Sequence, residues 1–490
     1  MIRLHRTRGG PGSGLLAAIE PSPLNRSVGG LRRDHPEMSA HTVLVAWQRR
    51  VLLGLVGLAT LGAAVAPAGT AIALIAVFTA AYLFVMGYNA LLFRATLRNP
   101  RVLCVSDEEA LAVADRDLPR YTVMIAAYHE AAVIAQTLHS VTALDYPRDR
   151  LEVKLLLEAD DTETIAAALA ARPEPEVEIV RVPVASPRTK PKALNYGLAL
   201  SGGELVTVYD AEDRPEPLQL RRAAVALARS DASVACLQAQ LYYHNEGQNL
   251  LTRLFAAEYA SWFATALPAM AELGAPLPLG GTSMHVRRDA LEHVGGWDPH
   301  NVTEDADLGI RLHRMGFRTE VLGSVTLEEA NSDPVNWVKQ RSRWYKGYIQ
   351  TWLVHMREPR RVWRELGGRG VAGLAAVVAG TPLLSLLNPL FWLLTAVWLV
   401  GGTAVRELYP AWLYYPAVLS LVLGNFLALY RIAVSVRSSG HPELLSAVLL
   451  WPAYWAWMSV AAVRAVAQLT IAPWFWEKTV HGLEHLAGAG

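Results

Sequence analysis

Long apolar runs at both ends of this 490-residue chain enclose a middle region in which charged residues are frequent. Two runs, 51–66 and 70–93, precede that region, and three, 371–400, 411–431 and 444–471, follow it. Each is close to the roughly 20 apolar residues that cross a bilayer as a helix. The sequence therefore predicts an α-helical membrane part with a globular domain inserted between its helices.

Charges beside the first two runs predict their orientation. Arg49 and Arg50 precede the first run, Arg94 follows the second, and the linker 67–69 is uncharged. The positive-inside rule then gives a hairpin with both ends in the cytosol. We expect an integral protein of the plasma membrane whose inserted domain is cytosolic. About five spans are expected, and the side of the C-terminus stays open.

The parts expected along the chain follow from these patterns and from composition. Residues 1–45 are rich in Gly, Pro, Ser and Arg and lack periodicity, which predicts a disordered tail. The net charge of +1 gives no reason to expect a nucleic-acid partner. The remaining parts are a transmembrane hairpin of two helices (46–94), the inserted domain (95–345), interfacial amphipathic helices (346–370), about three transmembrane helices (371–472) and a C-terminal segment (473–490).

Short apolar runs alternate with helical patterns inside the inserted domain. The runs 121–127, 153–157 and 205–209 predict β-strands that end in polar or acidic turns, and 131–142 and 217–229 predict helices. Such alternation indicates an α/β fold with a parallel sheet covered by helices on both faces. Ligands of these sheets bind beyond the carboxyl ends of the strands.

Two acidic clusters fall at such strand ends. Asp210, Glu212 and Asp213 follow the strand 205–209, and their hard oxygen ligands suit Mg²⁺ or Mn²⁺ bridging a diphosphate. The alternative is an acidic loop that caps the next helix. Asp160 and Asp161 follow the strand 153–157 and suit a nucleotide, although a helix N-cap explains them equally simply.

Three further groups carry residues suited to transfer chemistry. The segment 190–195 holds lysines at a helix start, where phosphate oxygens or solvent are the alternative partners. Asp305, next to Glu304, suits a general base or a capping box. On the predicted helix 334–355, Gln340 shares a face with Arg343 and Trp344. An arginine fork fits a diphosphate, and a tryptophan fits a sugar ring.

In these motifs the chain resembles the membrane-embedded, inverting family 2 glycosyltransferases. That family includes the bacterial cellulose synthase catalytic subunit and the chitin, hyaluronan and poly-N-acetylglucosamine synthases. The resemblance covers about residues 45–480. It implies an α/β GT-A domain, Rossmann-like with a mostly parallel sheet, inserted between α-helical transmembrane segments. A divalent metal, Mg²⁺ or Mn²⁺, is implied as the cofactor.

The resemblance also implies donor-site residues. Asp160 and Asp161 match the motif that holds the uridine, and Lys192 and Asn195 match a Lys-x-x-Asn motif near the diphosphate. Asp210 matches the first acid of the metal motif.

Two donor-site motifs depart from the family. Glu212, with Asp213 as a further candidate, replaces the usual second aspartate of the metal motif. Tyr128 and Glu130 are assigned to the nucleotide sugar, at a position where the family has Asn-Glu and this chain has His129-Glu130.

Catalysis and the acceptor are assigned by the same resemblance. Asp305 matches the catalytic base of a Thr-Glu-Asp motif that includes Glu304. Gln340, Arg343 and Trp344 match the Gln-x-x-Arg-Trp motif that clamps the diphosphate and the acceptor. Gly281 and Thr282 match the segment at the acceptor entrance. The C-terminal residues 476–482 are interpreted as a lid over the nucleotide or, alternatively, as an interfacial anchor.

The function implied is that of a processive inverting β-glycosyltransferase. It would extend a polysaccharide from UDP-glucose or UDP-N-acetylglucosamine and pass the chain through its own helices. An alternative is single transfer from the UDP-sugar donor to a lipid acceptor; a nucleotide-sugar-binding scaffold or transporter is less favoured. Membrane lipids are expected partners, and whether an accessory export subunit is also a partner stays open.

Overall fold

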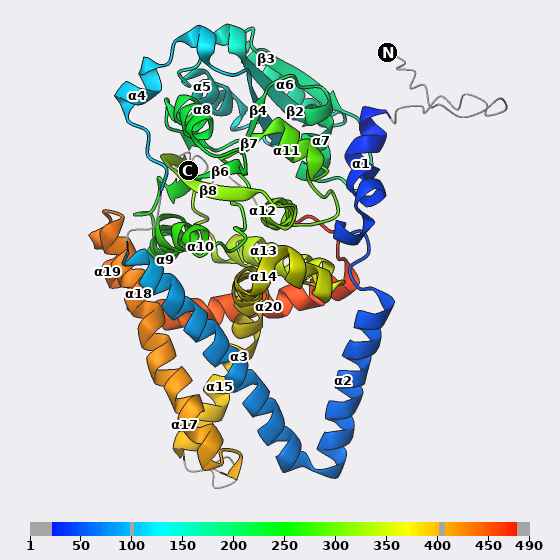
Figure 1. Cartoon of the computed structure of the whole chain (residues 1–490), viewed down its shortest axis with the longest axis vertical. Coiled ribbons are helices and arrows are strands. Elements are labelled where there is room, and N and C mark those ends of the chain that lie inside the picture. The colour runs from blue at the N-terminus through cyan, green and yellow to red at the C-terminus, as the bar shows by residue number, and fades with distance from the viewer. Residues whose placement is uncertain (1–21, 99–101, 401–406, 478–490) are drawn as a thin grey trace, which may run out of the picture.

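An eight-stranded sheet forms the centre of the inserted domain in the computed structural model, which describes residues 22–98, 102–400 and 407–477 (Figure 1). The strand order is β3-β2-β1-β4-β7-β6-β8-β5. Four of the seven strand pairings are parallel, including all those within β3-β2-β1-β4, and β7 is antiparallel to its neighbours. The strands are β1 Tyr121–Ala127, β2 Leu151–Glu158, β3 Val177–Val182, β4 Leu205–Tyr209, β5 Arg214–Pro215, β6 Val234–Tyr243, β7 Met284–Arg287 and β8 Arg318–Glu328.

Helices cover both faces of this sheet because its buried strands are apolar on both sides. In β1, Val123 and Ile125 point into one core and Met124 into the other. The first core is completed by α5 Ile134–Thr142, α6 Thr162–Ala170 and α8 Gln219–Arg229. The second is completed by α7 Lys190–Ala199, α11 Arg288–His293 and α12 Glu304–Arg314. The α/β prediction is confirmed.

Long apolar helices lie on one side of this domain (Figure 1). Four are long and apolar enough to cross a membrane among the described residues: α2 Ala46–Val65, α3 Pro67–Thr96, Pro359–Val400 and Ala411–Ser438. The third contains α14 Pro359–Gly373 and α15 Gly380–Val400, and the fourth contains α17 Ala411–Leu419 and α18 Asn425–Ser438. A fifth span requires the bent pair Pro442–Val448 and Trp451–Ile471, which meet at 69°, to cross as one unit.

Helix α20, Trp451–Ile471, runs across the other long helices in Figure 1. Its buried residues, among them Tyr454, Met458 and Ala461, recur at helical spacing, while Val460 and Val463 are exposed. It packs near α13, Pro334–His355, through the ring pair Trp337 and Tyr454. One buried stripe and one exposed apolar stripe suit a helix in the membrane interface, so the five-span count stays a prediction.

Residues 22–45 correct the expectation of a disordered tail. They contain a helix, α1 Pro23–Asp34, in which Leu31 is buried, and a following turn in which Met38 is buried. Asp298 accepts a hydrogen bond from the Ala40 amide at 2.5 Å. Composition alone missed this segment because few apolar side chains hold it, and the sheet domain supplies their partners. Residues 1–21 lie outside the described part.

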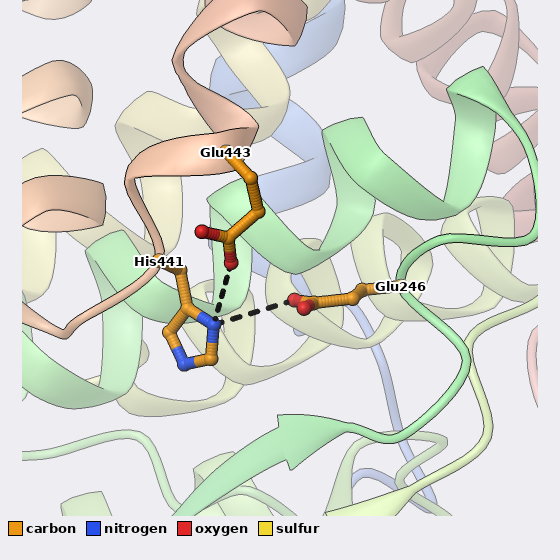
Figure 2. Close-up of side chains that lie close together, drawn as sticks. All are labelled: Glu246, His441 and Glu443. Atoms are coloured by element: carbon orange, nitrogen blue, oxygen red, sulfur yellow. Dashed lines mark hydrogen bonds and ion pairs between the residues drawn. The ribbon is translucent and has the colours of Figure 1, made fainter.

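The end of α18 is joined to the sheet domain by a polar cluster (Figure 2). His441 Nδ1 lies 3.2 Å from a Glu443 carboxylate oxygen and 3.5 Å from one of Glu246, which belongs to the loop after β6. The His441 ring also stacks on Tyr242 with 4.0 Å between centroids. These contacts join the last apolar helices to the sheet domain.

Candidate active site

A cavity of about 570 Å³ lies beyond the carboxyl ends of β1 and β4. Parallel strands end at the same edge of a sheet, so the polar turns after them meet there. Carboxylates dominate its wall: eight acidic side chains line it against three basic ones. The acids are Glu130, Glu158, Asp210, Glu212, Glu304, Asp305, Glu328 and Glu329, and the bases are Arg188, Lys190 and Arg343.

Among the three acids predicted to hold a metal, Asp210 and Glu212 line this cavity. Asp213 is buried behind them, where it accepts a hydrogen bond from the Asp210 amide at 2.7 Å and another from the Thr282 hydroxyl. Asp213 therefore shapes the turn, and burial, followed by the charges of Asp210 and Glu212, raises its pKa well above the usual value. Thr282, which was predicted to lie at the acceptor entrance, is also buried, and its hydroxyl supports Asp213.

Glu328 and Glu329 are cavity residues that the sequence analysis missed. Glu328 is the last residue of β8 and Glu329 follows it, so the rule applied to other acidic strand ends would have found them. Burial, then the carboxylates of Asp213 and Asp210, raises the pKa of Glu328 well above its usual value. Such an excess of carboxylates repels a diphosphate unless a cation lies between them. Asp210 and Glu212 offer the hard oxygen ligands that fit Mg²⁺ or Mn²⁺.

The lysine of α7 that reaches the cavity is Lys190, whereas the sequence analysis had assigned Lys192 to the diphosphate. Lys190 lines the cavity, pairs with Asp210 and donates to the Gly281 carbonyl at 3.0 Å. Burial opposes its charge, but Asp210 and Glu304 outweigh that effect and raise the pKa of Lys190. Lys192 points into the core instead, fully buried, with 2.7 Å between its Nζ and Glu158. A helix turns by about 100° per residue, which separates the two side chains.

Of the other residues expected to bind the donor, some line the cavity and others stabilise the loops and helices around it. Tyr128 and Glu130 line the cavity. Asp160 lies beside it in an ion pair of 2.9 Å with Arg188. Asp161 is buried and caps α6 through the Thr164 amide at 3.2 Å, the alternative that the sequence analysis had kept open. Asn195 braces a loop by donating to the Trp297 carbonyl at 2.7 Å.

Glu304 and Asp305 begin α12 and both line the cavity. Burial, then the charge of Asp305, raises the pKa of Glu304 to about 8. Burial also raises the pKa of Asp305, although Lys190 and Arg343 favour its ionised form. Gly281 has a φ of +83°, and a Cβ there would lie 2.8 Å from Asp305 Oδ2. Glycine at this position keeps the carboxylate open to a reacting group.

Helix α13 brings Gln340, Arg343 and Trp344 to the same cavity, as their spacing predicted. Gln340 Oε1 and Arg343 Nε are buried and have no hydrogen-bond partner among the described residues, which leaves both for a ligand. Arg341 points the other way, and its guanidinium makes two hydrogen bonds to Glu258 and lies 4.6 Å from the centre of the Trp344 ring. That pair fixes the plane of Trp344.

The segment after α20 forms part of the cavity wall. Trp474, Phe475 and Trp476 line it, and the Trp476 ring lies 4.7 Å from the Arg343 guanidinium carbon. Lys346 Nζ donates to the Phe475 carbonyl at 2.7 Å. The described part of the predicted lid, residues 476 and 477, therefore lies beside the site; 478–482 lie outside the described residues.

A second cavity, of about 710 Å³, lies among the long apolar helices, on the side called here the membrane side. Apolar and aromatic side chains form most of its wall, and helices α3, α15, α18 and α20 all contribute to it. Five residues line both this cavity and the first one: Tyr259, Gly280, Thr303, Asp305 and Trp344. The carboxylate of the expected base and the expected acceptor platform thus stand where the polar cavity meets the apolar one.

With this geometry the domain falls in the class of GT-A glycosyltransferases. Residues 119–347 match the family model described as glycosyltransferase like family 2. A solved structure supports the fold: a mannosyltransferase from Pyrobaculum calidifontis in complex with GDP-mannose and Mn²⁺. It has a TM-score of 0.55 and 22% identity, covering 81% of this chain and 99% of the other.

Two curated relatives are similar to about half of the chain. A probable glycosyltransferase of Bacillus subtilis, YdaM, is 29% identical over 47% of this chain and 56% of its own length. A β-monoglucosyldiacylglycerol synthase of a Synechocystis species is 32% identical over 54% of this chain and 56% of its own length. The chain thus spans about half the length of these relatives.

Proposed function

We propose that this protein transfers one hexose from a UDP-sugar to the hydroxyl group of a membrane lipid of the diacylglycerol type. The observation that carries this proposal is that Asp305 lines both cavities. A polar donor can approach it from one side and a lipid hydroxyl from the other. The name of the Synechocystis relative favours the same acceptor over a growing polymer.

The residues support a direct displacement. Asp305 takes the proton of the lipid hydroxyl, whose oxygen bonds to the anomeric carbon as the bond from that carbon to the diphosphate breaks. Attack from the face opposite the leaving group inverts the carbon. Lys190 and Arg343 bind the departing diphosphate, and Arg343 does so with a guanidinium that has an unpaired Nε.

A divalent cation fits the cavity because of its carboxylate excess. Asp210 and Glu212 would hold Mg²⁺ or Mn²⁺ there, and the ion would supply positive charge against the diphosphate. The fold relative in complex with Mn²⁺ supports this choice of ligand. We propose that the domain lies on the cytosolic side of the plasma membrane, because nucleotide sugars are made in the cytosol.

The test uses the full chain in nanodiscs containing diacylglycerol, with Mg²⁺ or Mn²⁺ and a panel of UDP-sugars. Mass spectrometry of the lipid extract should show one added hexose from one donor. D305N should lose about 10²- to 10⁴-fold in kcat while still binding UDP. A water-insoluble polymer would instead support the polysaccharide synthase. UDP binding without transfer to any acceptor would support the scaffold.

A further inference from the structure

Arg431 is a charged residue on the wall of the membrane-side cavity. It belongs to α18, within a candidate span whose mean hydropathy is 1.9. Its Nε is buried without a hydrogen-bond partner, and no ion pair of Arg431 occurs among the described residues. A charged side chain in such surroundings is costly unless a partner of opposite charge is present.

The cavity wall itself offers no available anion within the described ranges. Its carboxylates are Glu258 and Asp305. Glu258 is bound by Arg341 and by the Tyr454 hydroxyl at 2.7 Å. Asp305 faces Lys190 and Arg343, which favour its ionised form. The positive charge of Arg431 is therefore left for a ligand.

The position of Arg431 suits the headgroup of a lipid. Asn425, Ala428 and Arg431 recur at every third residue of α18, and all line the cavity. The helix ends at Ser438, which at 1.5 Å per residue is roughly 10 Å further on. His441 just beyond ties that end to the catalytic domain (Figure 2). Arg431 thus lies near the depth at which headgroups meet acyl chains.

We propose that Arg431 binds the phosphate of an anionic lipid in this cavity. The inference rests on the proposed function in one respect, that the cavity receives a lipid. A planar guanidinium matches phosphate oxygens in a forked geometry, whereas neutral diacylglycerol would leave the charge unpaired. The phosphate can belong to a glycerophospholipid or to a polyprenyl phosphate, two sources of the same chemistry.

The experiment measures lipid binding without any sugar donor. Delipidated full-length protein in a neutral detergent is titrated with phosphatidylglycerol, a polyprenyl monophosphate and diacylglycerol, and bound lipid is counted by native mass spectrometry. The wild type should bind at least one phosphate lipid about tenfold more tightly than diacylglycerol, a difference of about 1.4 kcal/mol. R431Q should lose that preference. R431K, which keeps the charge, should retain part of it.

R437Q is the matched control, because Arg437 is an exposed arginine on the same helix. It should bind like the wild type. Equal phosphate preference in R431Q and the wild type, or a wild type that prefers diacylglycerol, would overturn the inference. The phosphate lipid that the wild type prefers shows whether the bound phosphate belongs to a glycerophospholipid or to a polyprenyl phosphate. D305N should bind this lipid normally. Wild-type protein that binds the phosphate lipid but transfers no sugar to diacylglycerol would reject the proposed function and leave this inference standing.

Discussion

Glu304 and Asp305 are adjacent buried carboxyls. Burial and the charge of Asp305 favour the protonated form of Glu304. With a pKa of about 8, Glu304 is mostly protonated at pH 7 and ionises as the pH rises. Burial also raises the pKa of Asp305, but Lys190 and Arg343 favour its ionised form. The two residues therefore have different roles in one motif: Asp305 accepts a proton, and neutral Glu304 avoids a second negative charge next to the diphosphate.

This division predicts a particular pH dependence. E304Q should keep most wild-type activity at pH 7, because glutamine resembles a protonated glutamate. Wild-type kcat/KM should fall above about pH 8, where Glu304 becomes negative and repels the donor, and E304Q should lack this fall. Both should lose activity in acid as Asp305 is protonated. An E304Q variant as inactive as D305N at pH 7 would identify Glu304 as the base instead.

Substitutions of Lys190 and Lys192 test which of the two lysines binds the diphosphate. K190M should raise the KM for the donor about tenfold, or about 1.4 kcal/mol, with little change in Tm. K192M should leave Glu158 buried without its partner, a loss of about 3–5 kcal/mol in unfolding free energy. Thermal unfolding and donor kinetics separate the two effects. The control E158Q/K192M should recover much of the stability, and weak donor binding by a stable K192M would contradict the assignment.

At the scale of elements, the N-terminal segment depends on Arg357. Its guanidinium donates to the Pro36 carbonyl at 3.1 Å, to the Glu37 carbonyl at 3.1 Å and to the Ser39 carbonyl at 2.9 Å. The arginine lies just before α14, so these bonds join residues 36–39 to the region between domain and membrane.

We expect R357M to loosen this segment. Losing charge-assisted bonds to buried carbonyls should remove roughly 2–4 kcal/mol of local stability. Hydrogen–deuterium exchange should rise in 22–45 and stay unchanged in the sheet. R360M is the control, since Arg360 is exposed. Unchanged exchange in R357M would mean that α1 is held by other contacts alone.

At the scale of the whole molecule, the two cavities meet at Asp305, so blocking the membrane-side one should affect the acceptor but not the donor. Ala428 lines that cavity. A428W should reduce transfer to diacylglycerol about tenfold or more, or at least about 1.4 kcal/mol, and leave UDP binding intact. V422W, on an exposed position of the same span, should behave like the wild type. Equal lipid transfer by both variants would place acceptor entry elsewhere.

Periodicity and motif order in the sequence predict many of the secondary-structure elements and part of the site. The strand 121–127, the helix 217–229 and the grouping of Gln340, Arg343 and Trp344 follow from local patterns, because a strand or helix repeats its geometry along the chain. The two runs before the domain likewise form separate long helices. For these elements, local sequence and final structure agree.

Other features were decided by tertiary contacts alone. Whether Lys190 or Lys192 faces the cavity depends on how α7 is rotated against the sheet, and Asp213 and Asp161 turn inward because buried amides require acceptors. The helix α1 is held by partners far along the chain, such as Asn195, which donates to the Ser27 carbonyl. By itself the sequence determined which chemical groups the site contains. Packing decided which of them reach the ligand, because burial, charge pairing and cavity shape arise between segments that are distant in the chain.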